Sequence, residues 1–333
     1  MSDPAEIYTT LQAEIERVLI GNSDLVSDLT ISLLTGGHVL LEGVPGVAKT
    51  TAATLFARAS GLSESRVQMT PDLLPADVTG THVYHQATGE FRLQRGPIFA
   101  NVVIADEINR ATPKTQSALL EAMQERQVTI EGDTLALPTP FMVVATQNPI
   151  EMEGTFELPE AQLDRFQLKL RVDVPGEEEE LRVLQRFGTD PDLDVDRIDQ
   201  VVSSSELLEA KQAVVGVHVE EEVERYILTI IRESREHPDV QYGGSPRAGL
   251  AFLHASKGRA AIDGREYVTP EDVKSMAHKV LNHRLVLTPE AGFSDVTSDD
   301  VVDDLLSTVD APGGDPSREA VATSDGGSGP ADP

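Results

Sequence analysis

The sequence contains no cysteine. This absence excludes disulfide bonds, zinc sites with thiolate ligands and catalysis by a thiol. Long apolar runs are missing as well, since no uncharged stretch approaches the roughly 18 residues that a membrane-spanning helix needs. Residues 1–6 are acidic and lack the apolar core of a secretion signal. Together these absences predict a cytoplasmic protein without membrane insertion.

Basic residues are scarce, with 27 Lys and Arg against 56 Asp and Glu, and the formal net charge is -29. A surface of this sign repels phosphate backbones, so nucleic-acid binding is not expected. The acidic excess is spread along the whole chain, and Lys is scarce beside Arg. This composition is typical of proteins that stay hydrated in concentrated salt, and it predicts a halophilic protein.

Three short apolar segments read as buried strands, and helical or irregular segments separate them. They are residues 38–41, 101–105 and 141–145. Alternation of this kind predicts an α/β fold, in which helices cover both faces of a mostly parallel sheet. Thr112 and Pro113 have the residue types that begin a helix, and Ser298 could cap a last short helix.

A change of pattern after Pro175 and Gly176 predicts a domain boundary. Residues 1–176 form the predicted three-layer αβα domain. From there to residue 310 the chain reads as helices without evident strands, which predicts a smaller helical domain over residues 177–310. Residues 311–333 carry too few large apolar side chains to offset the entropy of ordering, so we predict a disordered acidic tail.

Residues 43–50 have the spacing of a phosphate-binding loop between a strand and a helix, although Ala48 occupies the place of the usual second glycine. Backbone N–H groups of such a loop point at the β- and γ-phosphates, Lys49 adds a positive charge, and Thr50 can bind Mg²⁺. Without the flanking strand and helix, the segment would be an ordinary turn. The sequence therefore predicts an ATP site. Its candidate residues are Gly43, Pro45, Gly46, Ala48, Lys49, Thr50 and Thr51.

Asp106 and Glu107 are adjacent carboxylates at the end of an apolar strand. Phosphoryl transfer needs one acid to hold Mg²⁺ through its water shell and another to orient the attacking water. Acidic pairs also occur in solvated strand-end turns. The phosphate-binding loop upstream favours the catalytic interpretation, with Asp106 as a metal residue and Glu107 as a catalytic residue.

Three further polar residues are candidates for completing the site. Asn148 follows the strand over 141–145 and could position water, or it could be part of an Asn-Pro turn. Arg165 could bind phosphate, or it could form a surface ion pair with Asp164. Arg247 stands at a predicted helix start in the second domain, and the sequence leaves its role open in the same way.

These stretches together resemble the MoxR family of AAA+ ATPases, and the resemblance runs from about residue 10 to residue 309. The strings that carry it lie at residues 69–80, 96–101, 105–111, 114–123, 145–151 and 158–166. The resemblance implies an AAA+ core followed by an all-helical lid domain. It also implies that Lys49 and Thr50 are Walker A ligands, that Asp106 and Glu107 are the Walker B acids, and that Asn148 is sensor 1.

The resemblance further implies a ring, with six subunits as the expected number. Arg165 would be the arginine finger that reaches the neighbouring subunit's site, with Arg110 as a second candidate, and Arg247 would be the sensor 2 residue acting on the same subunit's γ-phosphate. Insertions over about 70–96 and 128–137 would face the pore or a partner. Members of the family are thought to act as chaperone-like machines, often with a protein that carries a von Willebrand factor A-type domain, in complex assembly or metal-cofactor insertion on an unknown client.

Three alternatives remain open at this stage. The ATPase subunit of a metal chelatase would share the inserted elements. A nucleic-acid motor would need a basic hairpin tip, whereas residues 131–133 are Glu-Gly-Asp. A nucleotide-gated binding module without catalysis would not need the intact set of Lys49, Asp106, Glu107 and Asn148. Tyr84 and Phe91 could grip a client, but packing within a hairpin is the more ordinary use of such a pair.

Overall fold

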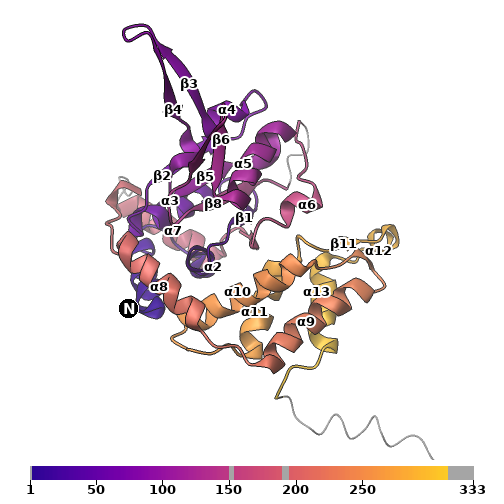
Figure 1. The fold of residues 1–333 in the computed structure, drawn as a ribbon. Coiled ribbons are helices and arrows are strands. Elements are labelled where there is room, and N and C mark those ends of the chain that lie inside the picture. The colour runs from indigo at the N-terminus through magenta and orange to yellow at the C-terminus, as the bar shows by residue number, and fades with distance from the viewer. Residues whose placement is uncertain (1, 150–153, 190–194, 314–333) are drawn as a thin grey trace, which may run out of the picture.

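The computed structural model describes residues 2–149, 154–189 and 195–313. Its centre is a sheet of five parallel strands in the order β2-β5-β8-β1-β9 (Figure 1). The parallel α/β prediction is therefore confirmed. Most of the predicted tail, residues 314–333, lies outside the described residues. The strands are β1 (Val39–Glu42), β2 (Glu64–Gln68), β5 (Val102–Asp106), β8 (Met142–Gln147) and β9 (Leu168–Arg171).

The sheet is buried on both faces, which explains why its central strands are continuous apolar runs. Val102 and Ile104 of β5 pack into one hydrophobic cluster with the helices of one face. Val103 and Ala105 point the other way, into a second cluster. The first face carries α1 (Pro4–Ile15), α2 (Ser23–Thr35) and α3 (Lys49–Ala59), and the second carries α4 (Pro75–Thr79) and α5 (Pro113–Glu125).

Two antiparallel hairpins extend from the second face. The longer one, β3 (Gly80–His85) with β4 (Glu90–Arg95), projects away from the body of the molecule (Figure 1). The rings of Tyr84 and Phe91 pack against each other at 5.3 Å, so the pair does serve hairpin packing. The shorter hairpin joins β6 (Gln127–Ile130) and β7 (Asp133–Ala136), and it carries the acidic turn.

The base of the longer hairpin is tightly packed. A Cβ atom on Gly80 would lie 2.4 Å from the carbonyl oxygen of Gln94, and one on Gly96 would lie 2.3 Å from that of Val78. No side chain fits at either position. The short helix η1 (Pro97–Phe99) follows directly and leads the chain back to β5.

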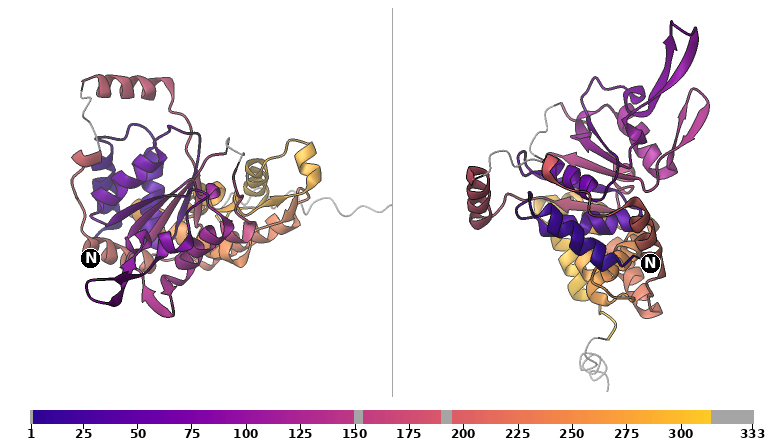
Figure 2. Two further views of the ribbon diagram at one scale, coloured as in Figure 1. Left: turned by 90° about the horizontal axis from the view of Figure 1, so that it is seen from above. Right: turned by 90° about the vertical axis from the view of Figure 1, so that its left-hand side faces the viewer.

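The C-terminal part is mainly helical, but the expectation of no strands there is wrong. β10 (Val240–Tyr242) and β11 (Val286–Leu287) form a small antiparallel pair, too short to leave an alternating pattern in the sequence. α7 lies at the margin of the molecule in both views of Figure 2, and the boundary predicted near residue 176 falls directly before it. The helices are α7 (Glu177–Thr189), η3 (Val195–Arg197), α8 (Ser204–Gly216), α9 (Glu221–Glu236), α10 (Pro246–Ile262), α11 (Pro270–Leu281), α12 (Pro289–Phe293) and α13 (Ser298–Thr308).

Two predicted helix starts can be compared with the structure. Thr112 does precede α5, but its hydroxyl contacts that of Thr115 at 3.2 Å and makes no bond to the helix backbone. The cap of α13 is Thr297 and not Ser298, because the Thr297 hydroxyl accepts from the N–H of Asp300 while the Asp300 carboxylate accepts from the N–H of Thr297. None of the described helices combines the length and the apolar character that crossing a bilayer requires.

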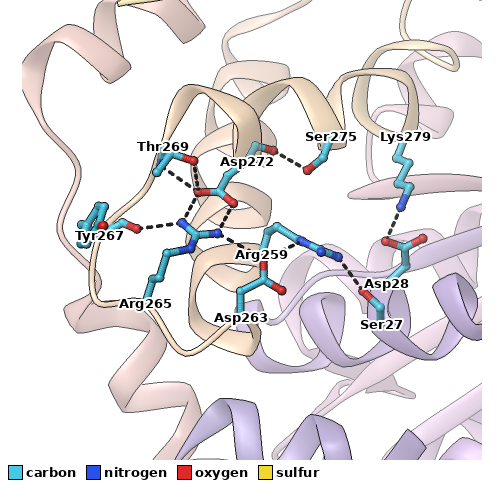
Figure 3. A network of polar contacts seen from close by, with 10 residues as sticks. All are labelled: Ser27, Asp28, Arg259, Asp263, Arg265, Tyr267, Thr269, Asp272, Ser275 and Lys279. Carbon is cyan, nitrogen blue, oxygen red and sulfur yellow. Dashed lines mark hydrogen bonds and ion pairs between the residues drawn. The ribbon is translucent and has the colours of Figure 1, made fainter. Parts of the chain in front are cut away.

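Polar contacts join the C-terminal helices to α2 (Figure 3). Lys279 of α11 donates to the buried carboxylate of Asp28 at 2.7 Å, and Arg259 of α10 reaches the hydroxyl of Ser27 at 3.4 Å. Burial raises the pKa of Asp28 to about 6, although the neighbouring Lys279 acts in the opposite direction. These contacts fix one side of the C-terminal domain to the core.

Candidate active site

The turn between β1 and α3 has the backbone shape of a phosphate-binding loop. Gly43 leaves no room for a side chain, since a Cβ there would lie 2.3 Å from the carbonyl oxygen of Val172. Gly46 has φ +88°, which favours glycine. Ala48 has φ 60°, so an alanine occupies the left-handed region at a cost of roughly 1 kcal/mol. The loop therefore accommodates an alanine where the usual motif has a glycine.

Lys49 begins α3 and lies over this loop. Its ammonium group donates to the carbonyl oxygens of Gly43 at 2.6 Å and Val44 at 2.8 Å. Burial lowers the pKa of Lys49, while the nearby carboxylates of Asp106 and Glu107 oppose this shift. The side chain thus holds a positive charge at the point where a phosphate would approach the helix N-terminus.

Asp106 accepts hydrogen bonds on both carboxylate oxygens, and it is 4% exposed. Its Oδ1 accepts from the hydroxyls of Thr50 at 2.6 Å and Thr146 at 3.0 Å. Its Oδ2 accepts from Arg66 Nε at 2.7 Å, and Arg66 Nη2 lies 2.6 Å away. A hydroxyl and a carboxylate held this close form an oxygen donor set of the kind that Mg²⁺ prefers, so the residues fit this ion.

Glu107 directly follows Asp106 and turns into the same cavity. Its φ of 56° is unusual for a glutamate, and backbone strain of this kind is common at functional sites. Its N–H donates to Thr146 Oγ1 at 2.9 Å. Its Oε2 accepts from Gln68 Nε2 at 2.8 Å, and Arg110 Nε, on η2 (Ile108–Arg110), lies 3.2 Å away. Arg110, the second finger candidate, therefore pairs with an acid of its own subunit.

These residues surround a cavity of about 400 Å³ at the carboxyl ends of the strands. Asn148 is buried and lines it together with Lys49, Thr50, Asp106 and Glu107. Four more predicted residues also line it: Pro45, Gly46, Ala48 and Thr51. The sequence did not single out the other five lining residues. The full lining consists of Pro45, Gly46, Val47, Ala48, Lys49, Thr50, Thr51, Arg66, Gln68, Asp106, Glu107, Thr146, Gln147 and Asn148.

The missed residues are Val47, Arg66, Gln68, Thr146 and Gln147. Arg66 and Gln68 stand on one face of the edge strand β2, and Gln68 is paired in register with Asp106. Two polar residues at alternate positions of a short strand could have indicated that one face of this strand lines a site. Finding their partners, however, required the strand order, which no local pattern contains.

Arg165 and Arg247 are not among the residues that line this cavity. The predicted alternative for Arg165, an ion pair with Asp164, is wrong, because Asp164 pairs with Arg284 at 2.7 Å and accepts from the Ser245 hydroxyl at 2.9 Å. The Nε atom of Arg165 is buried and has no hydrogen-bond partner among the described residues. Arg247 is exposed in the first turn of α10, where its N–H donates to Ser245 Oγ.

Comparisons with known proteins identify the family of this chain. Residues 38–168 match the ATPase family associated with various cellular activities (AAA), and residues 232–305 match the AAA lid domain. The chaperone MoxR1 of Mycobacterium tuberculosis is 43% identical over 319 residues, which cover 92% of this chain and 84% of that protein. The uncharacterised protein YeaC of Bacillus subtilis is 44% identical over 299 residues, or 90% of this chain and 92% of YeaC.

A solved structure from Cytophaga hutchinsonii, assigned as an ATPase, has the same fold. Its TM-score is 0.86 at 38% identity, and the match covers 92% of this chain and 96% of that one. The similarity to chelatase subunits is weaker. A magnesium-chelatase subunit ChlI homolog of Methanocaldococcus jannaschii is 26% identical over 197 residues, which are 57% of this chain and 51% of that protein.

Proposed function

The chain belongs to the MoxR family of AAA+ ATPases, and from this premise we propose that it hydrolyses ATP in the cavity at the strand ends. One observation carries the proposal. Lys49, Thr50, Asp106, Glu107 and Asn148 line a single cavity although they come from three separate segments of the chain. A binding module without catalysis would need the loop and its lysine, but it would have no use for Glu107 or Asn148.

The roles follow from the contacts of each residue. The N–H groups of the loop and the ammonium group of Lys49 would bind the phosphates. Thr50 and Asp106 would hold Mg²⁺, which neutralises charge on the β- and γ-phosphates. Glu107 would orient the attacking water and accept its proton, and the amide of Asn148 would help to fix that water. Thr146 links the two acids, because it accepts from the N–H of Glu107 and donates to Asp106.

Glu107→Gln tests this assignment most directly. The variant should keep its nucleotide affinity within about twofold and lose turnover by about 100-fold or more, whereas Lys49→Ala should weaken both. Steady-state phosphate release and equilibrium binding of a fluorescent ADP analogue measure the two quantities. Wild-type turnover by Glu107→Gln would show that this glutamate does not orient the water.

We further propose that the chain works as a hexameric ring and that Arg165 acts in the neighbouring subunit's site. The support is that Arg165 does not line its own cavity and that its Nε has no partner among the described residues. Arg247 would contact the γ-phosphate from the lid domain, residues 177–310. Arg110 is the less favoured finger, since it pairs with its own subunit's Glu107.

Mixed rings test the shared site. Arg165→Ala and Lys49→Ala subunits should each be nearly inactive alone. When they are mixed, some interfaces join an intact Lys49 to an intact Arg165, and hydrolysis should return. If labelled subunits exchange but activity does not return at any ratio, Arg165 is not the finger, and Arg110 takes its place in the same test.

The biological role that we propose is chaperone-like remodelling of protein complexes, with a partner that carries a von Willebrand factor A-type domain. MoxR1, the relative described as a chaperone, matches nearly the whole chain, which supports this role over that of a chelatase subunit. Tyr84 and Phe91 are 53% and 69% exposed on the projecting hairpin and offer a surface for a client. Purification of the Glu107→Gln protein in ATP, with identification of bound proteins, tests this role. Recovery of a metal-chelatase subunit would favour the second candidate.

A further inference from the structure

The turn that carries Arg165 is held by the lid domain. It follows α6 (Glu160–Leu163) and begins with Asp164, whose two carboxylate oxygens are both occupied by lid residues. Arg284 Nε donates to Oδ1 at 2.7 Å, and the Ser245 hydroxyl donates to Oδ2 at 2.9 Å. No contact between Asp164 and Arg165 competes with this arrangement among the described residues. Asp164 therefore belongs structurally to the lid as much as to the core.

Arg284 holds the backbone of the same turn. Its Nη2 donates to the carbonyl oxygen of Phe166 at 2.6 Å, and its Nη1 donates to that of Gln167 at 3.1 Å. Nη1 also donates to the carbonyl oxygen of Val280 in α11 of the lid. The neighbouring His283 reaches the Phe166 carbonyl from Nε2 at 3.1 Å. Only 3% of the Arg284 side chain is exposed. Loss of these partners would leave the buried charge of Arg284 without compensation, which is energetically costly. The contact between Arg284 and the turn should therefore persist while the protein is folded.

Both neighbours of Arg165 are consequently immobilised. Asp164 is bound to the lid, and the Phe166 side chain is fully buried in the hydrophobic cluster beneath α5. Only two rigid peptide units connect Arg165 to these fixed points. The backbone of Arg165 is therefore held between a residue bound to the lid and a residue buried in the core.

The other contacts between lid and core lie elsewhere. Figure 3 shows Lys279 and Arg259 reaching Asp28 and Ser27 on α2. These contacts attach the lid without touching the turn that carries Arg165. The chain thus offers one lid arginine that grips this turn and another that anchors the lid to α2.

We propose that Arg284 is a positioning residue for Arg165, and that the lid of one subunit thereby controls hydrolysis in the neighbouring subunit. This rests on the proposed function of Arg165 across the interface. Ser245 extends the connection, because the residue that caps the helix of Arg247 also binds Asp164. A shift of that helix on nucleotide binding is passed through Asp164 to Arg165 and so to the next site.

Mixed rings distinguish this role from simple stabilisation of the fold. Arg284→Gln alone should lower turnover by about tenfold or more, with nucleotide affinity within about twofold of wild type, since its own cavity is intact. Mixed with Lys49→Ala subunits, it should regain hydrolysis, because its intact cavity then meets a well-placed Arg165. Mixed with Arg165→Ala subunits, it should regain nothing, since both subunits lack a working finger.

Two further variants keep the test decisive. Asp164→Asn removes the charge pair while preserving size, and it should repeat the pattern if Arg284→Gln does not fold. Arg259→Gln is the matched control, a lid arginine directed at α2, and it should leave turnover in homogeneous rings within about twofold of wild type. Melting curves and labelled subunit exchange verify folding and mixing.

The outcomes separate the inference from the function on which it rests. If Arg165→Ala with Lys49→Ala regains activity while neither Arg284→Gln nor Asp164→Asn does so with Lys49→Ala, the positioning role is overturned and the finger assignment stands. If the Arg165→Ala pair itself regains nothing, the finger assignment is overturned, and the positioning role falls with it.

Discussion

Two aspartates in this chain have nearly the same partners, and they serve opposite purposes. Asp106 and Asp164 each accept from a hydroxyl on one oxygen and from an arginine on the other. The arginine on Asp106 is 61% exposed at the mouth of a cavity, whereas the one on Asp164 is 3% exposed and bound to backbone carbonyls as well. The first pair can separate when an ion arrives, and the second cannot separate without exposing a buried charge. The solvent exposure of the arginine thus distinguishes the two pairs. We call Asp106 with Arg66 the exchangeable site, and Asp164 with Arg284 the joint between lid and core.

The largest expected effect comes from neutralising the two aspartates separately. Asp106→Asn should lower magnesium-dependent hydrolysis by about 100-fold or more, and it should cost less stability than Asp164→Asn, because the exposed Arg66 stays solvated without its partner. Asp164→Asn should cost about 3 kcal/mol of stability, because the charge of Arg284 loses its partner. Phosphate release and urea unfolding measure the two effects. Similar stability losses in both variants would contradict the distinction between site and joint.

Acid should affect the joint through His283. Burial holds the pKa of His283 well below its usual value, and Arg284 adds to this shift. Burial likewise lowers the pKa of His38, in the core, to about 4. Both are neutral in the folded state, so the unfolded state binds more protons below pH 6.5, and stability should fall as the pH drops from there. For His38 the loss reaches about 3 kcal/mol near pH 4.

His283→Gln isolates the contribution of the joint, because the amide can still donate to the Phe166 carbonyl. The free energy of unfolding should then decline less between pH 6.5 and 4 than in the wild type. Asp28 acts with the opposite sign between about pH 4 and 6, so the difference between the two proteins is the useful quantity. Parallel pH curves for variant and wild type would show that His283 already titrates normally in the fold.

A smaller effect should appear at the exchangeable site. The guanidinium group of Arg66 is bound to Asp106 and repels a second cation there. Arg66→Gln should therefore lower the magnesium concentration needed for half-maximal nucleotide binding. The expected change is about threefold, because an exposed ion pair contributes roughly 0.5–1 kcal/mol. Titration of Mg²⁺ against a bound fluorescent ADP analogue measures it. Arg92→Gln, on the projecting hairpin, is the control. An unchanged or higher requirement in Arg66→Gln would mean that the arginine does not compete with the ion.

Salt should change the stability contribution of each charged group least, although the small contributions add up over the whole surface. With a net charge of -29, self-repulsion destabilises the compact state in dilute buffer. At 1 M salt the Debye length is about 3 Å, so KCl should raise the melting temperature. The buried Asp164–Arg284 pair is not screened, and Asp164→Asn should keep the same deficit at both salt concentrations. Equal melting temperatures in dilute buffer and molar KCl would contradict the halophilic prediction while leaving the ATPase proposal intact.

Local sequence patterns predicted those parts of the site whose position depends on a single segment of the chain. The phosphate-binding loop, the acids at 106 and 107 and the residue Asn148 depend on a strand, a turn and a helix start in sequence, and all three segments were found. Arg66 was missed because its partner depends on β2 being the neighbour of β5. The Asp164–Arg284 joint spans two domains, and the nearer residue, Arg165, looked like the natural partner for Asp164. β10 and β11 were missed because they are too short to show a period.

The projecting hairpin has a mechanical consequence. Six residues along each strand, at about 3.3 Å per residue, give an arm of roughly 20 Å. Its base is closely packed at Gly80 and Gly96, where backbone atoms of the two chain segments lie next to each other and leave no room for a side chain. Tyr84 lies four residues from Gly80, so a turn of about 10° at this base would move Tyr84 and its neighbour Phe91 by roughly 2 Å. Any small angular change at this base would therefore be converted into a displacement of a few ångströms at the tip of the hairpin.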